Sequence, residues 1–376
     1  MADTIREYRF IPLSPVHIGS GETLAPENYA LSPDGEELIA IDTRALVRKL
    51  PDQGRQAYED LLEAGNLAGA LNFIRGVFAG LQKRAAGKRT PFELYRIQLG
   101  KKAIREVRQA VENPLQRKGE IHALQRNPYT GDVVIPGSSV KGAMRTAVLS
   151  GNVNPGGQKD RRVESELAPL KGPRKARRLE ELGFAYDPKH LEADPFRLVE
   201  VSDAAWPAGA VRIDRAEVRN PSRPETKPEG MQLHYERLLS EADNPEALPD
   251  CRLRIQLNEE ALRDGRVKAL IKRPIDWDKL ANDCNTFFSG RFNAEWTTFE
   301  TILPDRQRWY PEMQPGDILL RVGRHSHFDS LSVDNFRQGW NIQANKPIFE
   351  IGSTRTLCEL AGGGWAPFGW VLLRPV

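Results

Sequence analysis

The sequence predicts an α+β fold, because short strands alternate with helices along both halves of the chain. Residues 7–15 (EYRFIPLSP) alternate apolar and polar side chains, as a strand does. Residues 55–81 place apolar side chains at helical spacing, and residues 317–322 (DILLRV) predict a strand that ends at a glycine. A chain of 376 residues is long for a single domain, so we expect two α+β units with one sheet in each half.

The first half begins with a strand, a hairpin and a helix. Residues 29–41 predict the hairpin, with Pro33, Asp34 and Gly35 at its turn. Asp42 is the predicted N-cap of a helix over residues 43–50. We expect a helical insertion over about residues 43–125, between strands of the first sheet.

The segment IPGSSVKGAMR, residues 135–145, combines several features that favour an anion. A strand ends at a glycine and a helix follows, with Ser138 or Ser139 as its N-cap. Lys141 and Arg145 are four residues apart and therefore share one helix face. A helix N-terminus offers unpaired N–H groups and the positive end of its dipole. Two interpretations stay open: an ordinary capped helix with solvated cations, or a phosphodiester site. The segment lacks the spacing of a nucleotide P-loop.

The second half repeats the alternation after a charged connection. Residues 152–178 are rich in Gly, Pro and charge, which predicts a basic loop or inter-domain linker. The boundary between the two units is placed after residue 190. Further strands are predicted at residues 196–201, 211–218, 252–257, 348–357 and 370–373, helices at 258–270 and 276–287, and a polar loop at 220–230.

Composition and charge exclude several classes of protein. The net charge is only +3, but residues 82–89, 101–108 and 159–178 are locally basic. No apolar run is long enough to span a membrane, and the first ten residues contain no apolar leader, so we expect a cytoplasmic protein. The three cysteines are scattered, with neither disulfide nor zinc spacing, and no cofactor or metal is predicted.

A few side chains suggest chemistry but have simpler roles. His325 and His327 would share one face of a strand and meet one ion or phosphate, yet only Asp329 lies nearby as a third ligand. Asp42, Asp132 and Asp203 are better explained as capping or turn residues than as catalytic acids.

Several of these segments together resemble a known family. The order SPVHIGSGE, YALSPDGEELIAIDTRAL, IPGSSVKGAMRTAVL, DILLRVG and GGGWAPFGWVLL resembles the RAMP superfamily of CRISPR-associated proteins. Within that superfamily, the order is most similar to the subunit that caps the 3′ end of the guide RNA in type III-A (Csm) effector complexes. The matching segments cover both ends and the centre of the chain.

The resemblance implies a more specific fold and a set of RNA contacts. It implies two ferredoxin-like (RRM/RAMP-type) βαββαβ domains, residues 1–190 and 191–376, with glycine-rich loops. The segment GRHSH at residues 323–327 contains fewer glycines than the corresponding run of the family. The residues expected to contact guide RNA (crRNA) are His17, Gly19, Ser20, Gly21, Ser138, Ser139, Lys141, Arg145, Gly323, Arg324, Gly362, Gly363 and Gly364.

The function implied is that of a binding subunit without catalysis. It would hold the backbone of the guide, support guide maturation and antiviral defence, and assemble with the other RAMP subunits of the Csm complex. One alternative is a metal-independent endoribonuclease, in which His17 is the general base and Lys141 stabilises the phosphate. A second is a scaffold whose basic loop, residues 159–178, recruits host nucleases that trim the guide.

Overall fold

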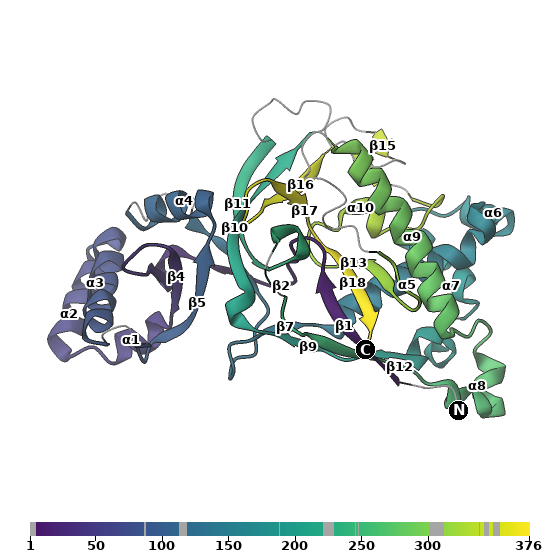
Figure 1. Ribbon diagram of the computed structural model, residues 1–376, viewed down its shortest axis with the longest axis horizontal. Coiled ribbons are helices and arrows are strands. Elements are labelled where there is room, and N and C mark those ends of the chain that lie inside the picture. Colours follow the sequence, from purple (N-terminus) through teal and green to yellow (C-terminus); the bar gives the residue numbers. More distant parts are fainter. Residues whose placement is uncertain are drawn as a thin grey trace.

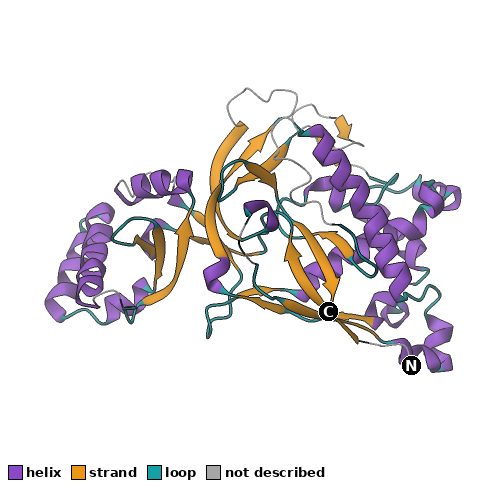
Figure 2. Cartoon of the chain, viewed as in Figure 1, coloured by secondary structure: helices purple, strands orange, loops and turns teal. Residues whose placement is uncertain are grey.

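The computed structural model describes residues 5–85, 88–112, 119–187, 189–220, 229–244, 246, 248–300, 312–337, 339–341, 346–348 and 354–376. Strands and helices alternate along the chain, and curved sheets lie between two groups of helices (Figure 2). The predicted α+β class is confirmed. The predicted loop over residues 220–230 lies largely outside the described residues, and so do residues 349–353 of the strand predicted over 348–357. The end of that predicted strand, residues 355–357, is confirmed as part of a strand.

One sheet brings the two ends of the described chain together. It contains β1 (Ile5–Pro12), β8 (Val199–Val201), β12 (Arg252–Leu257), β13 (Ile318–Arg321) and β18 (Trp370–Pro375), in the order β13-β18-β1-β12-β8. Its pairings are antiparallel, and β1 lies between β12 and β18. The expectation of one sheet in each half is therefore wrong, because both edges of β1 pair with strands from the second half of the chain, which local patterns do not reveal.

A second, larger sheet also mixes the two halves. It contains β2 (Gly19–Leu24), β3 (Tyr29–Leu31), β4 (Glu37–Ile41), β5 (Glu93–Leu99), β6 (Ile121–Leu124), β10 (Val211–Arg219), β11 (Glu229–Leu238), β16 (Arg355–Glu359) and β17 (Trp365–Pro367). The parallel pairs β5–β10 and β6–β11 connect early strands to late ones. Within the described chain, two short ladders pair β7 (Val133–Ile135) with β9 (Ala204–Trp206) and β14 (Gly339–Asn341) with β15 (Lys346–Ile348). Two ferredoxin-like domains with a boundary at residue 190 stay a prediction.

The helices form two groups on opposite sides of the sheets (Figure 1). The N-terminal arm holds α1 (Thr43–Arg48), α2 (Asp52–Glu63), α3 (Leu67–Ala85) and α4 (Lys101–Glu112) together with β3 to β5. The other group holds α5 (Gly137–Val153), α6 (Arg161–Leu167), α7 (Pro173–Phe184), α8 (Gly265–Leu270), α9 (Trp277–Thr298) and α10 (His327–Ser330). Within that group α5 packs against α7 and α9, and it also contacts β13 of the first sheet.

The N-terminal arm has a small core of its own, in which Ile39 and Ile41 of β4 pack with Leu46, Ile74 and Phe78. The predicted hairpin over residues 29–41 is confirmed by the pairing of β3 with β4. The predicted cap is also confirmed, since the Ala45 N–H donates to Asp42 Oδ1 at 2.8 Å. The expected helix over residues 55–81 is two helices, because Gly65 has a φ of +69° between them.

The predicted basic loop over residues 152–178 is wrong, because most of it is helical. Asp160 caps α6, and the buried Val163 and Leu167 are one helical turn apart. Pro173 begins α7, whose Leu179 is buried. In the sequence, many charged residues surround these few apolar positions, so their helical spacing is not apparent. No helix in the described part of the chain is both long and apolar enough to cross a membrane.

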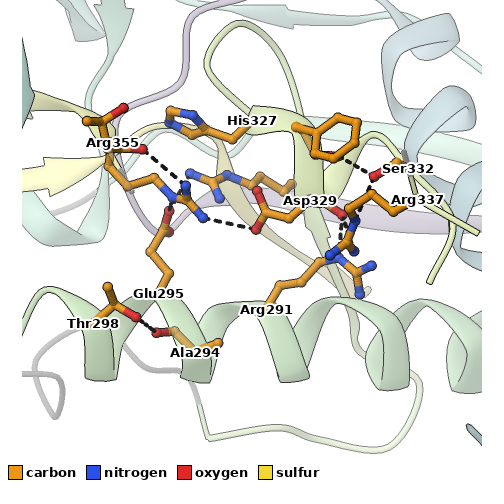
Figure 3. A network of polar contacts seen from close by, with 12 residues as sticks. Arg291, Ala294, Glu295, Thr298, His327, Asp329, Ser332, Arg337 and Arg355 are labelled. Atoms are coloured by element: carbon orange, nitrogen blue, oxygen red, sulfur yellow. Dashed lines mark hydrogen bonds and ion pairs between the residues drawn. The ribbon is translucent and has the colours of Figure 1, made fainter. Parts of the chain in front are cut away.

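Buried charges join α9 to both sheets (Figure 3). Glu295 of α9 accepts a hydrogen bond from Arg355 Nε of β16 at 2.7 Å, and Arg321 Nη2 of β13 lies 2.9 Å from the same carboxylate. The indole of Trp370 donates to the other Glu295 oxygen at 2.7 Å. Arg355 also reaches Asp329 at 3.1 Å. These groups are buried, so the two arginines belong to the interior and not to a nucleic-acid surface.

Candidate functional site

Two of the predicted glycine segments meet at one pocket. We call this the histidine pocket; it has a volume of about 300 Å³ and is lined by His17, Ile18, Gly19, Gly21, Glu22, His122, Ala123, Gly323 and Arg324. Five of the predicted contact residues therefore lie at one place. Ser20 is exposed between the two glycines of β2, and its hydroxyl accepts a hydrogen bond from the Glu22 N–H.

His17 is anchored by the larger sheet. Its Nδ1 lies 2.7 Å from the carbonyl oxygen of Glu236 on β11, and its side chain is buried. The Glu236 carboxylate is buried too, and it accepts from the Leu124 N–H at 3.0 Å, from Arg126 at 3.1 Å and from Tyr95 at 3.0 Å. These contacts fix the strand that holds His17.

Gly323 brings the segment after β13 against His17. Its φ is +81°, and a Cβ at this position would lie 2.4 Å from the His17 carbonyl oxygen. The close approach lets the Arg324 N–H donate to that oxygen at 2.8 Å. The Arg324 side chain itself is exposed at the pocket. Any larger residue at position 323 would separate the two segments.

Further aromatic and imidazole rings surround the pocket. Tyr235 of β11 stacks on His122 of β6 at 4.5 Å between ring centres, and it lies edge-on to His17 at 4.9 Å and to His325 at 5.1 Å. Neither His122 nor Tyr235 was predicted from the sequence as a site residue. The alternation of side chains in the strand IHAL could have placed His122 on the face of the strand away from the buried Ile121 and Ala123. That alternation does not reveal that His122 lies close to His17.

The histidines of the pocket are held neutral. Burial, opposed by the hydrogen bond to Glu236, lowers the pKa of His17 to about 4. Burial and then the nearby Arg324 charge lower the pKa of His122, and the same two causes lower that of His325 to about 3. Arg324 is thus the cation of this pocket, and Glu22 adds a carboxylate at its rim. The arrangement suits a ligand that carries both an anion and a hydrogen-bond donor.

The start of α5 differs from the prediction. Pro136 is the N-cap, no serine side chain caps the helix, and the Gly137 N–H donates to Asp203 Oδ1 at 2.8 Å. The expectation that Ser138 or Ser139 is the N-cap is therefore wrong, because an acid distant in sequence satisfies the N-terminus. A Cβ on Gly137 would meet the Val201 carbonyl oxygen, so the backbone packs closely here. The first helical N–H is already occupied by an acid.

Lys141 and Arg145 have different surroundings. Arg145 pairs with Asp194 at 2.8 Å and with Glu180 at 3.1 Å, and its guanidinium lies 4.5 Å from the centre of the Phe184 ring. Burial opposes its charge, but both carboxylates raise its pKa. Lys141 is partly exposed, and no hydrogen bond or ion pair of its side chain occurs among the described residues. Lys141 is thus available to a ligand, whereas Arg145 is held by the protein.

Gly362, Gly363 and Gly364 form the exposed turn between β16 and β17. Gly363 and Gly364 both have a φ of +89°, which favours glycine. The turn is anchored by the Ala361 N–H, which donates to Asp243 at 2.8 Å. These glycines do not line the histidine pocket.

The basic segment over residues 159–178 carries its own counterions. Lys159 pairs with Glu164 at 2.7 Å, and Arg177 pairs with Glu181 at 3.3 Å. Arg178 pairs with both Glu166 and Glu181. These pairs lower the local positive charge that the sequence suggested.

His325 and His327 are not alternate residues of a strand, as expected. Both have positive φ, 65° and 60°, and α10 begins at His327. Their ring centres are 6.4 Å apart, and Asp329 is paired with Arg355. Among the residues that the structure describes, no three His, Cys, Asp or Glu side chains are grouped to hold a metal ion.

Comparisons with known proteins agree with this architecture. The fold matches a chain of a Csm–crRNA–target RNA ternary complex of a type III-A CRISPR-Cas system, with 20% identity and a TM-score of 0.66, over 98% of this chain and 99% of that one. It also matches Csm5 from T. onnurineus, with 18% identity and a TM-score of 0.59, over 97% and 99% of the two chains. No curated protein matches significantly. The RAMP superfamily model matches residues 9–305, and the chain therefore belongs to the RAMP superfamily.

Proposed function

We propose that the chain is a guide-RNA-binding subunit of a type III-A CRISPR ribonucleoprotein. It caps the 3′ end of the guide, supports guide maturation and antiviral defence, and performs no catalysis. Its partners are the guide RNA, the other subunits of the Csm complex and the host nucleases that trim the guide. The fold shared with a chain of a complex that holds crRNA and target RNA supports this proposal.

The observation that carries the proposal is the meeting of two glycine segments at the histidine pocket. His17, Gly19 and Gly21 lie on one side of it, and Gly323 and Arg324 lie on the other. Arg324 offers an exposed guanidinium for a phosphate, and the glycines leave room for a backbone. Phosphate contacts carry no sequence information, which suits a subunit that accepts guides of varied sequence.

The test compares two arginines that are both exposed. Arg324→Glu should weaken binding of a labelled guide RNA and lower the slope of log K against log salt by about 0.7 for each lost phosphate contact. Arg263→Glu is the control, since the Arg263 side chain is 73% exposed and does not line the histidine pocket. Guides shortened at the 3′ end should lose affinity, and guides shortened at the 5′ end should not. Equal effects of the two arginine substitutions would contradict the proposal.

The endoribonuclease alternative is favoured by one observation, which is that His17 lines a pocket beside Arg324. Two observations weigh against it. An imidazole with a pKa of about 4 is a weak base at neutral pH, and the proposed partner Lys141 does not line the pocket. Labelled guide precursor incubated with the protein and EDTA distinguishes the two functions. Cleavage that His17→Ala abolishes would establish the nuclease and contradict a purely binding role.

A further inference from the structure

The hydrogen-bonding roles of the two His17 nitrogens are fixed by the backbone. Nδ1 lies 2.7 Å from the Glu236 carbonyl oxygen, and a carbonyl oxygen can only accept. Nδ1 therefore carries the proton and donates it to that oxygen. Because the ring is neutral, the other nitrogen, Nε2, has a free lone pair and acts as an acceptor.

The lone pair on Nε2 is open toward the histidine pocket. His17 lines this pocket, and among the described residues no hydrogen-bond partner of Nε2 occurs. A Cβ on Gly19 would lie 2.6 Å from Nε2, closer than two such atoms pack. The absence of a side chain at position 19 therefore keeps Nε2 accessible from the pocket.

The neighbours of Nε2 narrow the class of ligand. The side chain of Arg324 supplies a cation at the same pocket as Nε2, and the backbone N–H of Arg324 donates to the His17 carbonyl oxygen. The carboxylate of Glu22 lines the same pocket and would repel an anion. An anionic group would therefore bind on the side of the pocket where Arg324 lies. The ligand must therefore present a hydrogen-bond donor close to an anion. A ribose 2′-hydroxyl beside its own 3′-phosphate has this pattern, and deoxyribose lacks the donor.

We propose that the histidine pocket recognises the sugar of one guide nucleotide: Nε2 of His17 accepts a hydrogen bond from the 2′-hydroxyl, while Arg324 binds the neighbouring phosphate. This inference rests on the proposed RNA-binding function and deepens it. It makes His17 the residue that distinguishes RNA from DNA at one position, without contact to a base and without proton transfer.

The test replaces single 2′-hydroxyls of a labelled guide RNA by 2′-fluorine, which keeps the ribose conformation but cannot donate. In the wild-type protein, substitution at one position should weaken binding about tenfold, the effect of one hydrogen bond of about 1.4 kcal/mol. His17→Asn keeps a donor for the Glu236 carbonyl but has no atom in the place of Nε2. It should bind the unmodified guide about tenfold more weakly and lose the sensitivity at that position.

A second variant and a control keep the test independent of folding. Gly19→Ala places a methyl group against Nε2 and should also abolish the positional sensitivity. His190→Asn is the control, since this exposed histidine does not line the pocket, and it should retain the sensitivity. If no single position matters in the wild type, or if both His17→Asn and Gly19→Ala keep the sensitivity, the inference is overturned. A wild-type protein that fails to bind any guide would instead contradict the proposed function itself.

Discussion

Substitution of Arg145 should affect stability and not RNA affinity. The side chain is only 23% exposed, and its guanidinium pairs with Asp194 at 2.8 Å and Glu180 at 3.1 Å and stacks on Phe184. Arg145→Ala removes charged hydrogen bonds that are partly screened by solvent and a cation–π contact, together roughly 2–4 kcal/mol. With an unfolding entropy of about 2.1 cal/mol/K per residue, this loss lowers Tm by about 3–5 °C.

The assay is thermal unfolding of Arg145→Ala and Lys141→Ala side by side, with guide-RNA affinity measured for both. Lys141→Ala should change the free energy of unfolding by less than about 0.5 kcal/mol, because its side chain has no partner among the described residues. It should instead weaken RNA binding. Arg145→Glu is a poor probe of RNA binding, since it sets a third acid beside two carboxylates. If Arg145→Ala kept the wild-type Tm and lost RNA affinity, the assignment of Arg145 to packing would be wrong.

Three further substitutions or conditions have defined outcomes. Glu295→Gln should lower Tm by about 4–6 °C, because the loss of the carboxylate charge beside two buried arginines lowers the free energy of unfolding by about 3–5 kcal/mol. The control Glu260→Gln changes an exposed carboxylate and should shift Tm by no more than about 1 °C. Asp203→Ala should cost about 1 kcal/mol in urea unfolding, because the Gly137 N–H loses its acceptor, and Asp203→Asn should restore most of it. Folding lowers the pKa of His17 from about 6.5 to about 4, so Tm should drop as the pH falls from about 6.5 to about 4. The drop of Tm with pH should be less steep in His17→Asn, and equal slopes in the two proteins would refute this prediction.

Features set by neighbouring residues could be predicted from the sequence. The Asp42 cap depends on an N–H three residues away, and the hairpin of β3 and β4 depends on its own turn. The strands β1, β10, β12 and β13 were also predicted close to their observed bounds, because their apolar periodicity is local. Local patterns could not decide whether residues 135–145 form an ordinary capped helix or a phosphodiester site.

Features set by distant residues could not be predicted. Asp203, which caps α5, is 66 residues from Gly137, and the two acids that hold Arg145 are 49 and 35 residues away. Each pairing depends on the finished fold, in which strands of both halves share two sheets. The histidine pocket has the same origin, since Tyr235, His122 and His17 meet through the pairing of β11 with β6 and the hydrogen bond to Glu236.

A crosslink map of the assembled ribonucleoprotein tests the central claim most directly. A photoreactive nucleotide would be placed in turn at each position near the 3′ end of the guide, and the crosslinked peptides would be identified. We expect crosslinks to residues 17–22 and 323–324 of the histidine pocket, with further ones near Lys141, and their loss with Arg324→Glu. Crosslinks from the 3′ end that fall only on other surfaces or other subunits would contradict the account.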